Sequence, residues 1–114
     1  MSFPGAEYLY HILDETRYIL SQTKKLEKES FLENETLQRA FVRSIEIIGK
    51  ATKNTPNSLK QKYSQIAWRD MAGMRDVLIH DYFGIDYDIV WDVAINKIPS
   101  LHQEIEKIIQ NENK

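Results

Sequence analysis

Apolar residues recur at helical spacing along almost the whole chain, and this pattern limits its possible folds more than any other feature. Between Glu7 and Glu27 the stripe recurs at steps of three or four residues and comprises Leu9, Ile12, Leu13, Thr16, Ile19, Leu20, Thr23 and Leu26. A period of about 3.6 residues places them on one face of a helix. No segment of useful length alternates polar and apolar residues as a half-buried strand does. The pattern therefore predicts an all-α protein with a first helix over Glu7–Glu27.

Three further helical segments and one short turn follow the first helix. We expect the long segments at Asn34–Thr52, Ala67–Phe83 and Tyr87–Gln110, and the short turn at Leu59–Tyr63. The stretch NTPNS (Asn54–Ser58) is a clear break. Pro99 lies inside the last segment, and because proline lacks a backbone N–H, we expect a kink or a restart near Lys97. The sequence thus predicts an up-and-down bundle of four main helices plus a short helical turn.

Length and composition are those of a single domain spanning residues 1–114. A chain of 114 residues can bury one hydrophobic core and is short for two. The absence of cysteine excludes thiolate chemistry and any need for an oxidising compartment. The chain has no apolar run long enough to span a membrane, and its N-terminus lacks a signal-peptide pattern. We therefore expect a cytoplasmic protein without a membrane partner.

The second helical segment carries a band of basic residues although the formal net charge is −2. At about 100° per residue, one sector of the helix contains Arg39, Arg43, Lys50 and Lys53, with Glu46 among them. By itself such a band is typical of a solvated helix face. As a functional surface it would follow nucleic-acid phosphates, which gives affinity without sequence specificity.

The stretch GMRDVLIHDYFGID (73–86) concentrates polar groups in an otherwise apolar segment, namely Arg75, His80 and Tyr82. Arginine holds a phosphate with two hydrogen bonds, and histidine titrates near neutrality and acts as a general acid or base. RNA supplies its own nucleophile, the 2′-hydroxyl, so this pair could cleave RNA without a metal. From these residues alone, a helix end that happens to be polar is an equally good interpretation.

Helical geometry restricts how these three side chains could meet. Arg75 and Tyr82 would lie within about 20° of each other on a regular helix. His80 would lie about 140° from Arg75, on the side of Asp76. One straight helix therefore cannot direct all three at one substrate. Either the helix unwinds around His80 to Gly84, or a second subunit supplies part of the site, in a homodimer whose close approach Gly73 would permit.

A metal site is the other interpretation of the histidines. Asp76 and His80 are four residues apart, share a helix face and could bind one metal ion. No second pair of ligands lies near them in the sequence, and the paired Glu-x-x-His motifs of di-iron bundles are absent. We therefore expect a hydrogen bond between these two side chains, with no metal and no cofactor.

Together with its flanks, the polar stretch resembles the motif of HepT-like proteins, which are small α-helical domains of the HEPN superfamily. The family pattern is Arg, four residues, His, one residue and Tyr, and it stands here as Arg75, His80 and Tyr82. The flanking stretches IEIIGKA, IAWRDMAGMRDVLIHDYFGID and IVWDVAINKIPSL match as well. The resemblance extends from about Tyr8 to Ile109.

The resemblance implies a HEPN-type bundle that acts as a homodimeric, metal-independent endoribonuclease, the toxin of a toxin–antitoxin pair. Arg75 would bind the scissile phosphate, His80 would be the acid–base group, and Asp76 would orient His80. The antitoxin would be an MntA-like nucleotidyltransferase that adds AMP to Tyr82, a site-lining residue, and so silences the toxin. The expected RNA products carry 2′,3′-cyclic phosphate and 5′-hydroxyl ends.

One position departs from the family pattern. Family members often carry an acidic residue where Lys50 stands, so here Lys50 adds positive charge to the band of Arg39 and Arg43, and we expect these three residues to bind RNA.

The alternative function is a non-catalytic HEPN module that docks a nucleotidyltransferase and presents RNA, a nucleotide or Tyr82 to it. Cleavage of RNA by the isolated protein would separate the two.

Overall fold

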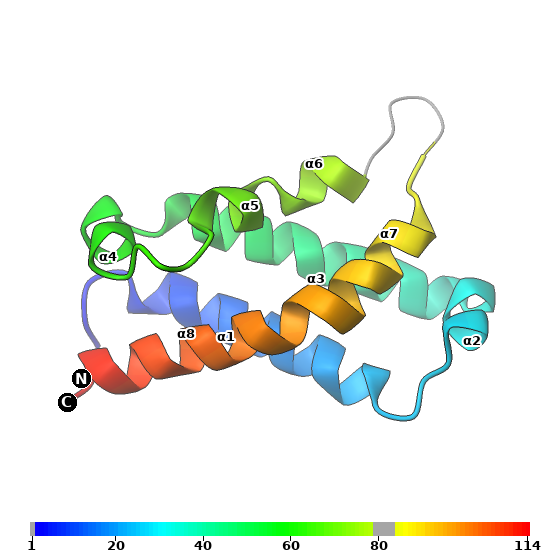
Figure 1. The fold of residues 1–114 in the computed structure, drawn as a ribbon, viewed down its shortest axis with the longest axis horizontal. Helices are drawn as coiled ribbons and strands as arrows, with labels where there is room; N and C mark the ends of the chain where they lie inside the picture. Colours follow the sequence, from blue (N-terminus) through cyan, green and yellow to red (C-terminus); the bar gives the residue numbers. More distant parts are fainter. Residues whose placement is uncertain (1, 79–83) are drawn as a thin grey trace.

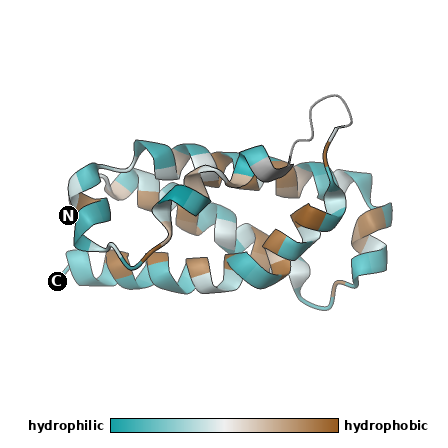
Figure 2. Ribbon diagram, turned by 45° about the horizontal axis from the view of Figure 1, so that its top comes forward, coloured by the Kyte–Doolittle hydropathy of each residue, from teal (hydrophilic) through white to brown (hydrophobic). Residues whose placement is uncertain are grey.

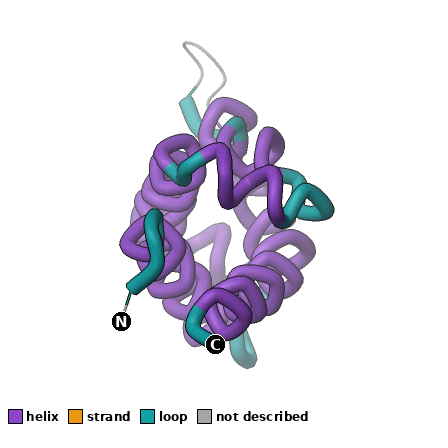
Figure 3. Tube along the Cα trace, turned by 90° about the vertical axis from the view of Figure 1, so that its left-hand side faces the viewer, coloured by secondary structure: helices purple, strands orange, loops and turns teal. Residues whose placement is uncertain are grey.

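All regular elements in the described residues, 2–78 and 84–114 of a computed structural model, are helices, so the all-α prediction is confirmed. Figure 3 shows them as tubes around a common interior. In chain order they are α1 (Ala6–Thr23), α2 (Lys28–Glu33), α3 (Glu35–Asn54), α4 (Asn57–Lys62), α5 (Trp68–Ala72), α6 (Met74–Leu78), α7 (Tyr87–Asp92), the π-helix η2 (Val93–Lys97) and α8 (Ile98–Glu112).

The chain passes along the bundle four times in alternating directions (Figure 1). Helix α1 runs one way and α3 returns; α5 and α6 form the third pass, and the rod of α7, η2 and α8 forms the fourth. Both termini therefore lie at the same end of the molecule. This is the predicted up-and-down arrangement, and α4 is the predicted short turn. No helix in the described part of the chain has both the length and the apolar composition needed to cross a bilayer.

The core is built from the apolar stripes that the periodicity predicts. Phe41, Ile45 and Ile48 of α3 have no exposed surface; α1 packs against α3, and α8 packs against α1, so that the three stripes belong to one core. Figure 2 shows hydrophobic and hydrophilic positions alternating along the helices. Burial of one such side chain contributes about 1.5–3 kcal/mol, so these stripes supply most of the driving force for folding.

Helix α1 is shorter than the sequence predicts, because it ends at Thr23 and not at Glu27. Lys24 leaves the helical region with a ψ of 122°, and Lys25 takes a left-handed conformation with a φ of 61°. These two residues turn the chain toward α2, and the remaining predicted residues belong to that connection. Leu26 still packs against the core from outside the helix.

Helix α2 was not predicted, since six residues are too few to show a clear helical period. Its one buried side chain is that of Phe31, which has no exposed surface. The ring of Phe31 lies 5.1 Å from that of Phe41 and 5.4 Å from that of Trp91, measured between centroids. The buried amide of Gln38 donates to the carbonyl of Phe31 at 3.1 Å. These contacts attach α2 to α3 and α7.

The single helix predicted over Ala67–Phe83 is wrong in its described part, because the chain forms α5 and α6 with a turn at Gly73 between them. The N–H of Gly73 donates to the carbonyl of Arg69 at 3.0 Å, and the carbonyl of Gly73 accepts from the N–H of Asp76 at 3.0 Å. Glycine costs a helix about 1 kcal/mol relative to alanine, so the break falls where helix propensity is lowest. Residues 79–83 of the predicted helix lie outside the described residues.

The last predicted helix is a continuous rod that changes its winding just before Pro99. The N–H of Ile98 donates to the carbonyl of Val93, five residues earlier, which is the π-helical pattern of η2. Helix α8 then begins at Ile98, with Pro99 in its first turn. Proline has no N–H to donate to the preceding turn, and a π segment accommodates that missing bond. The change of winding falls near Lys97, where the sequence predicts a kink or a restart, but the helical backbone continues through it.

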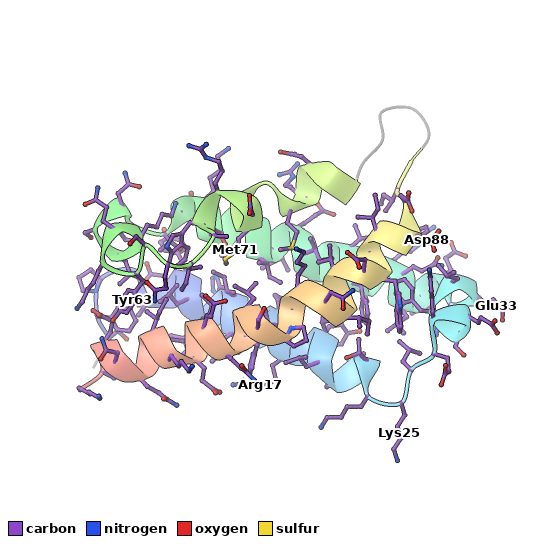
Figure 4. All side chains as sticks on the ribbon, in the orientation of Figure 1. Arg17, Lys25, Glu33, Tyr63, Met71 and Asp88 are labelled. Carbon is purple, nitrogen blue, oxygen red and sulfur yellow. The ribbon has the colours of Figure 1, made fainter. Side chains whose placement is uncertain are left out.

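A cluster of polar side chains joins α4 to the end of α8. Lys62 forms an ion pair of 2.7 Å with Glu112, and the hydroxyl of Tyr63 donates to the same carboxylate. Figure 4 labels Tyr63 at this end of the bundle. The hydrogen bond from Lys62, followed by that from Tyr63, holds the pKa of Glu112 below its usual value. The cluster fixes the connection that leads from α3 into α5.

Candidate functional site

A positively charged hollow of about 570 Å³ lies between the C-terminal end of α3 and the α5–α6 turn. Its lining contains three cationic side chains and one carboxylate, and comprises Gly49, Lys50, Lys53, Asn54, Ala72, Arg75 and Asp76. Two of the cations come from α3 and the third, Arg75, comes from α6. The hollow thus combines the basic band of the second predicted helix with the first residue of the polar motif.

Gly49 allows α3 and the α5–α6 turn to approach closely enough to form this hollow. A Cβ atom at Gly49 would lie 3.4 Å from the carbonyl oxygen of Ala72 and 3.8 Å from Cγ of Arg75. Any longer side chain would occupy the space that the stem of Arg75 now fills. A Cβ at Gly73, by contrast, would meet only the carbonyls of its own turn, at 3.4 and 4.0 Å. Within the chain, Gly49 and not Gly73 makes the close approach.

The hollow carries more positive than negative charge. Lys50, Lys53 and Arg75 are exposed, and none of them forms an ion pair with another described residue. Asp76 is the single carboxylate in the lining. Three cations facing one carboxylate leave a site that attracts an anion, and arginine in particular suits the geometry of a phosphate.

The structure brings together three of the predicted site residues. Arg75 and Asp76 are neighbours on α6, and both line the hollow with Lys50. His80 and Tyr82 lie outside the described residues. Their predicted roles, and the hydrogen bond expected between Asp76 and His80, therefore remain predictions.

Arg39 and Arg43 share the helix with Lys50 but lie outside the hollow. Arg39 is eleven residues before Lys50, which corresponds to about 16 Å along α3. Its guanidinium forms an exposed ion pair of 2.7 Å with Glu35. Arg43 is exposed and about 10 Å from Lys50 along the helix. The band predicted from the sequence is thus divided into a part inside the hollow and a part leading away from it.

A second hollow, of about 470 Å³, lies on the other side of the α5–α6 segment, against the rod of α7, η2 and α8. Its lining includes the apolar side chains of Met71, Met74, Ile89, Val93 and Leu101, with charged residues around them. Figure 4 labels Met71 on α5, beside this rod. The short segment that carries Arg75 therefore separates a basic hollow from a mainly apolar one.

The described residues contain no group of three histidine, aspartate or glutamate side chains that could hold a metal ion. His11 is exposed on α1, and His102 is engaged with Thr16, its Nδ1 lying 2.8 Å from the threonine hydroxyl. His80 is not among these residues, so metal independence remains a prediction.

Sequence reasoning missed Gly49, and it placed Lys53 in the basic band without counting it among the residues expected to bind RNA. A glycine in the middle of the helical pattern IEIIGKA is a usable signal, because an isolated helix glycine usually has a packing reason. The neighbourhood of Lys53 and Arg75 had no such signal, since the two residues are 22 positions apart and meet only through the packing of α3 on α6.

Comparison with known proteins identifies the family of the chain. The family model described as Ribonuclease HepT-like matches residues 12–108. The chain is 45% identical, over 92% of its length and 94% of the relative's, to "Putative RNase TTE0752" of Caldanaerobacter subterraneus subsp. tengcongensis. It is 45% identical to "Putative RNase MJ0127" of Methanocaldococcus jannaschii, over 91% of this chain and 86% of the other.

A third relative, "Probable ribonuclease HepT" of Thermococcus cleftensis, is 42% identical over 90% of this chain and 93% of its own. No solved structure matches the chain significantly. The family match covers most of the chain and includes the helices that form the basic hollow. The chain therefore belongs to the HepT-like ribonuclease family of the HEPN superfamily.

Proposed function

We propose that this protein is a metal-independent endoribonuclease that acts in the cytoplasm as the toxin of a toxin–antitoxin pair. Family membership and the ribonuclease names of its relatives support RNA as the substrate. The observation that carries the proposal is the position of Arg75, the first motif residue, in a hollow where positive charge outweighs negative. Such a hollow is suited to the phosphates of a nucleic-acid backbone.

In this mechanism the RNA provides the nucleophile and the protein provides charge and proton transfer. The 2′-oxygen forms a bond to phosphorus as the bond from phosphorus to the 5′-oxygen breaks, leaving 2′,3′-cyclic phosphate and 5′-hydroxyl ends. Arg75 holds the phosphate and stabilises the negative charge that grows on it. His80 transfers the proton that leaves the 2′-hydroxyl and the one that the 5′-oxygen gains, while Asp76 orients its ring.

The active unit in this proposal is a homodimer. On a regular helix, Arg75 and His80 would point in directions about 140° apart, so a second copy of the motif is one way to complete the site. The apolar hollow beside the α5–α6 segment supports an interface there, because its lining leaves Met74 and Ile89 only partly buried in the single chain. Two motifs would then face one RNA strand.

The proposed antitoxin is an MntA-like nucleotidyltransferase that transfers AMP to the hydroxyl of Tyr82. An added nucleotide would bring a phosphate and a bulky group to the residue two positions from His80. This would place negative charge where the RNA phosphate has to bind and would so block the substrate. Family membership supports this proposal, and no described contact bears on it.

The decisive experiment is cleavage of end-labelled RNA in EDTA by protein whose intact mass shows no AMP adduct. Wild type is expected to cleave and to leave cyclic-phosphate ends, and His80→Ala is expected to lose about 10²–10⁴-fold in rate. His11→Ala is the matched control, because His11 is exposed on α1 and lines neither hollow. Cleavage that survives His80→Ala or requires a divalent metal would contradict the mechanism.

If protein of verified mass cleaves none of several RNA classes, the ribonuclease proposal is wrong, and the non-catalytic docking module becomes the better account. The same preparation would then be expected to bind a nucleotidyltransferase. Mapping the cut positions on messenger, transfer and ribosomal RNA identifies the natural substrate class if cleavage occurs.

RNA binding by the basic band is tested by salt dependence. We propose that Arg39, Arg43 and Lys50 contact RNA phosphates. The slope of log K against log salt is negative, and for single strands each lost phosphate contact reduces its magnitude by about 0.7. Arg43→Gln is expected to show this reduction, and Arg39→Gln a smaller one, because Arg39 is already paired with Glu35. An unchanged slope for Arg43→Gln would remove that residue from the RNA path.

A further inference from the structure

We propose that the basic hollow between α3 and α6 is a subsite for a backbone phosphate next to the one that is cleaved, and that Lys53 and Lys50 hold it. The inference rests on the proposed ribonuclease function and specifies how that site binds its substrate. Arg75 reaches the hollow from α6 and serves the scissile phosphate, whereas the two lysines reach it from α3.

The two lysines are placed to act on one group. They are three residues apart on α3, so their Cβ atoms are about 5–6 Å apart on the same face of the helix. Both line the hollow, and both are exposed. Flexible ammonium groups with three donors each can converge on a phosphate between α3 and α6 without further ordering of the backbone.

The simplest structural role for Lys53 would be to cap the end of α3, where cations are favoured by the helix dipole. Other groups already serve those last carbonyls. The hydroxyl of Thr55 donates to Ala51 at 2.8 Å, and its N–H donates to Thr52 at 3.2 Å. The amine of Lys60 approaches the carbonyl of Lys53 itself at 3.5 Å. Capping therefore does not account for the amine of Lys53.

The charge balance of the hollow also favours an anionic ligand. Elsewhere in the described chain, Lys28, Arg39 and Lys62 each have a carboxylate partner within 3.0 Å. Lys50 and Lys53 have no such partner among the described residues. Cations gathered around one space repel one another, and a phosphate placed among them relieves that repulsion while forming charge-assisted hydrogen bonds.

A consequence of the proposal is that the enzyme prefers substrates with a phosphate beside the scissile bond. A dinucleotide has only the scissile phosphate, so it leaves the subsite empty. A longer RNA fills it and gains binding energy from both lysines. The subsite therefore predicts a preference for longer RNA that does not depend on the identity of the bases.

The first test measures binding and does not depend on cleavage. The probe is a fluorescent 2′-O-methyl oligoribonucleotide, which lacks the attacking hydroxyl, titrated by anisotropy over a range of salt. The Lys50→Gln/Lys53→Gln double variant is expected to reduce the magnitude of the negative slope of log K against log salt by about 0.7–1.4 relative to wild type. Lys25→Gln is the matched control, because this lysine lies in the α1–α2 connection, at a distance from α6 (Figure 4).

The second test uses oligonucleotides with a single ribose, so that only one bond can be cut, and with or without a flanking phosphate. Wild type and Lys25→Gln are expected to have a higher kcat/KM for the longer substrates, and the double variant is expected to lose about tenfold of that advantage. Lys50→Gln and Lys53→Gln, tested singly, are each expected to lose part of it.

The two tests separate failure of the subsite from failure of the proposed function. If wild type cleaves and the double variant keeps both the salt slope and the length preference of Lys25→Gln, the subsite is wrong while the ribonuclease function stands. If neither wild type nor any variant cleaves, but the double variant shows a weaker salt dependence of binding than wild type, the hollow is a phosphate site and the ribonuclease function is wrong.

Discussion

Gly49 offers the sharpest test of how the fold builds the basic hollow, because two substitutions there separate helix propensity from packing. Alanine and leucine have nearly equal helix propensities, and both exceed glycine by about 0.8–1.0 kcal/mol. They differ in how far the side chain reaches toward α6. The pair Gly49→Ala and Gly49→Leu therefore isolates the contact between α3 and the α5–α6 turn.

Gly49→Ala is expected to stabilise the protein by about 0.5–1 kcal/mol, since the new Cβ would be no closer than 3.4 Å to any neighbour, which is an ordinary contact distance. For a 114-residue domain this corresponds to a rise in Tm of about 2–4 °C. Gly49→Leu makes the same gain in propensity but must displace Arg75, whose Cγ lies 3.8 Å from the Cβ position. Overpacking costs about 1–3 kcal/mol, so the leucine variant should be less stable than the alanine variant by that amount.

Thermal and urea unfolding measure both variants, and RNA binding at low temperature reports on the position of Arg75. The leucine variant is expected to bind RNA more weakly than the alanine variant even where both are fully folded. Two results would refute the reasoning. One is a loss of more than about 1 kcal/mol in Gly49→Ala, and the other is equal stability and equal RNA binding in the two variants.

Two further predictions concern the ends of the bundle. The pKa of Glu112 is lowered by its hydrogen bonds from Lys62 and Tyr63, so the stability it contributes is present above its unfolded pKa of about 4.3 and is lost as pH falls through the lower folded value. Glu112→Gln should therefore lose less stability than wild type between pH 7 and pH 3 in urea unfolding; equal losses would contradict this. Phe31→Ala removes the ring that packs on Phe41 and should cost about 3–5 kcal/mol, and a cost below 1 kcal/mol would show that α2 is not held this way.

The parts of the fold that were predictable from sequence are those where the spacing of apolar residues within one helix determines which face is buried. The stripe of Phe41, Ile45 and Ile48 has the period of a helix, and all three side chains are fully buried. Pro99 indicates the change of winding before α8 because the missing N–H is a property of the residue itself. Such features need no knowledge of neighbouring elements.

Short elements were predicted poorly because their stability comes from other parts of the chain. Helix α2 depends on Phe31 packing against α3 and α7, which a six-residue pattern does not reveal. The turn at Gly73 looked like an interior helix position because its flanks are good helix formers. Helices this short are marginal by themselves, so tertiary packing decides where they begin and end.

For the candidate site, the sequence by itself determined the chemical groups and the family to which they belong. The spacing of Arg75, His80 and Tyr82, with its flanks, is a local property of the chain, and the family match agrees with it. Only the tertiary structure decided that Arg75 faces Lys50 and Lys53, because these residues lie on different passes of the bundle. Their meeting depends on how closely α6 can approach α3, and that distance is set by the missing side chain of Gly49.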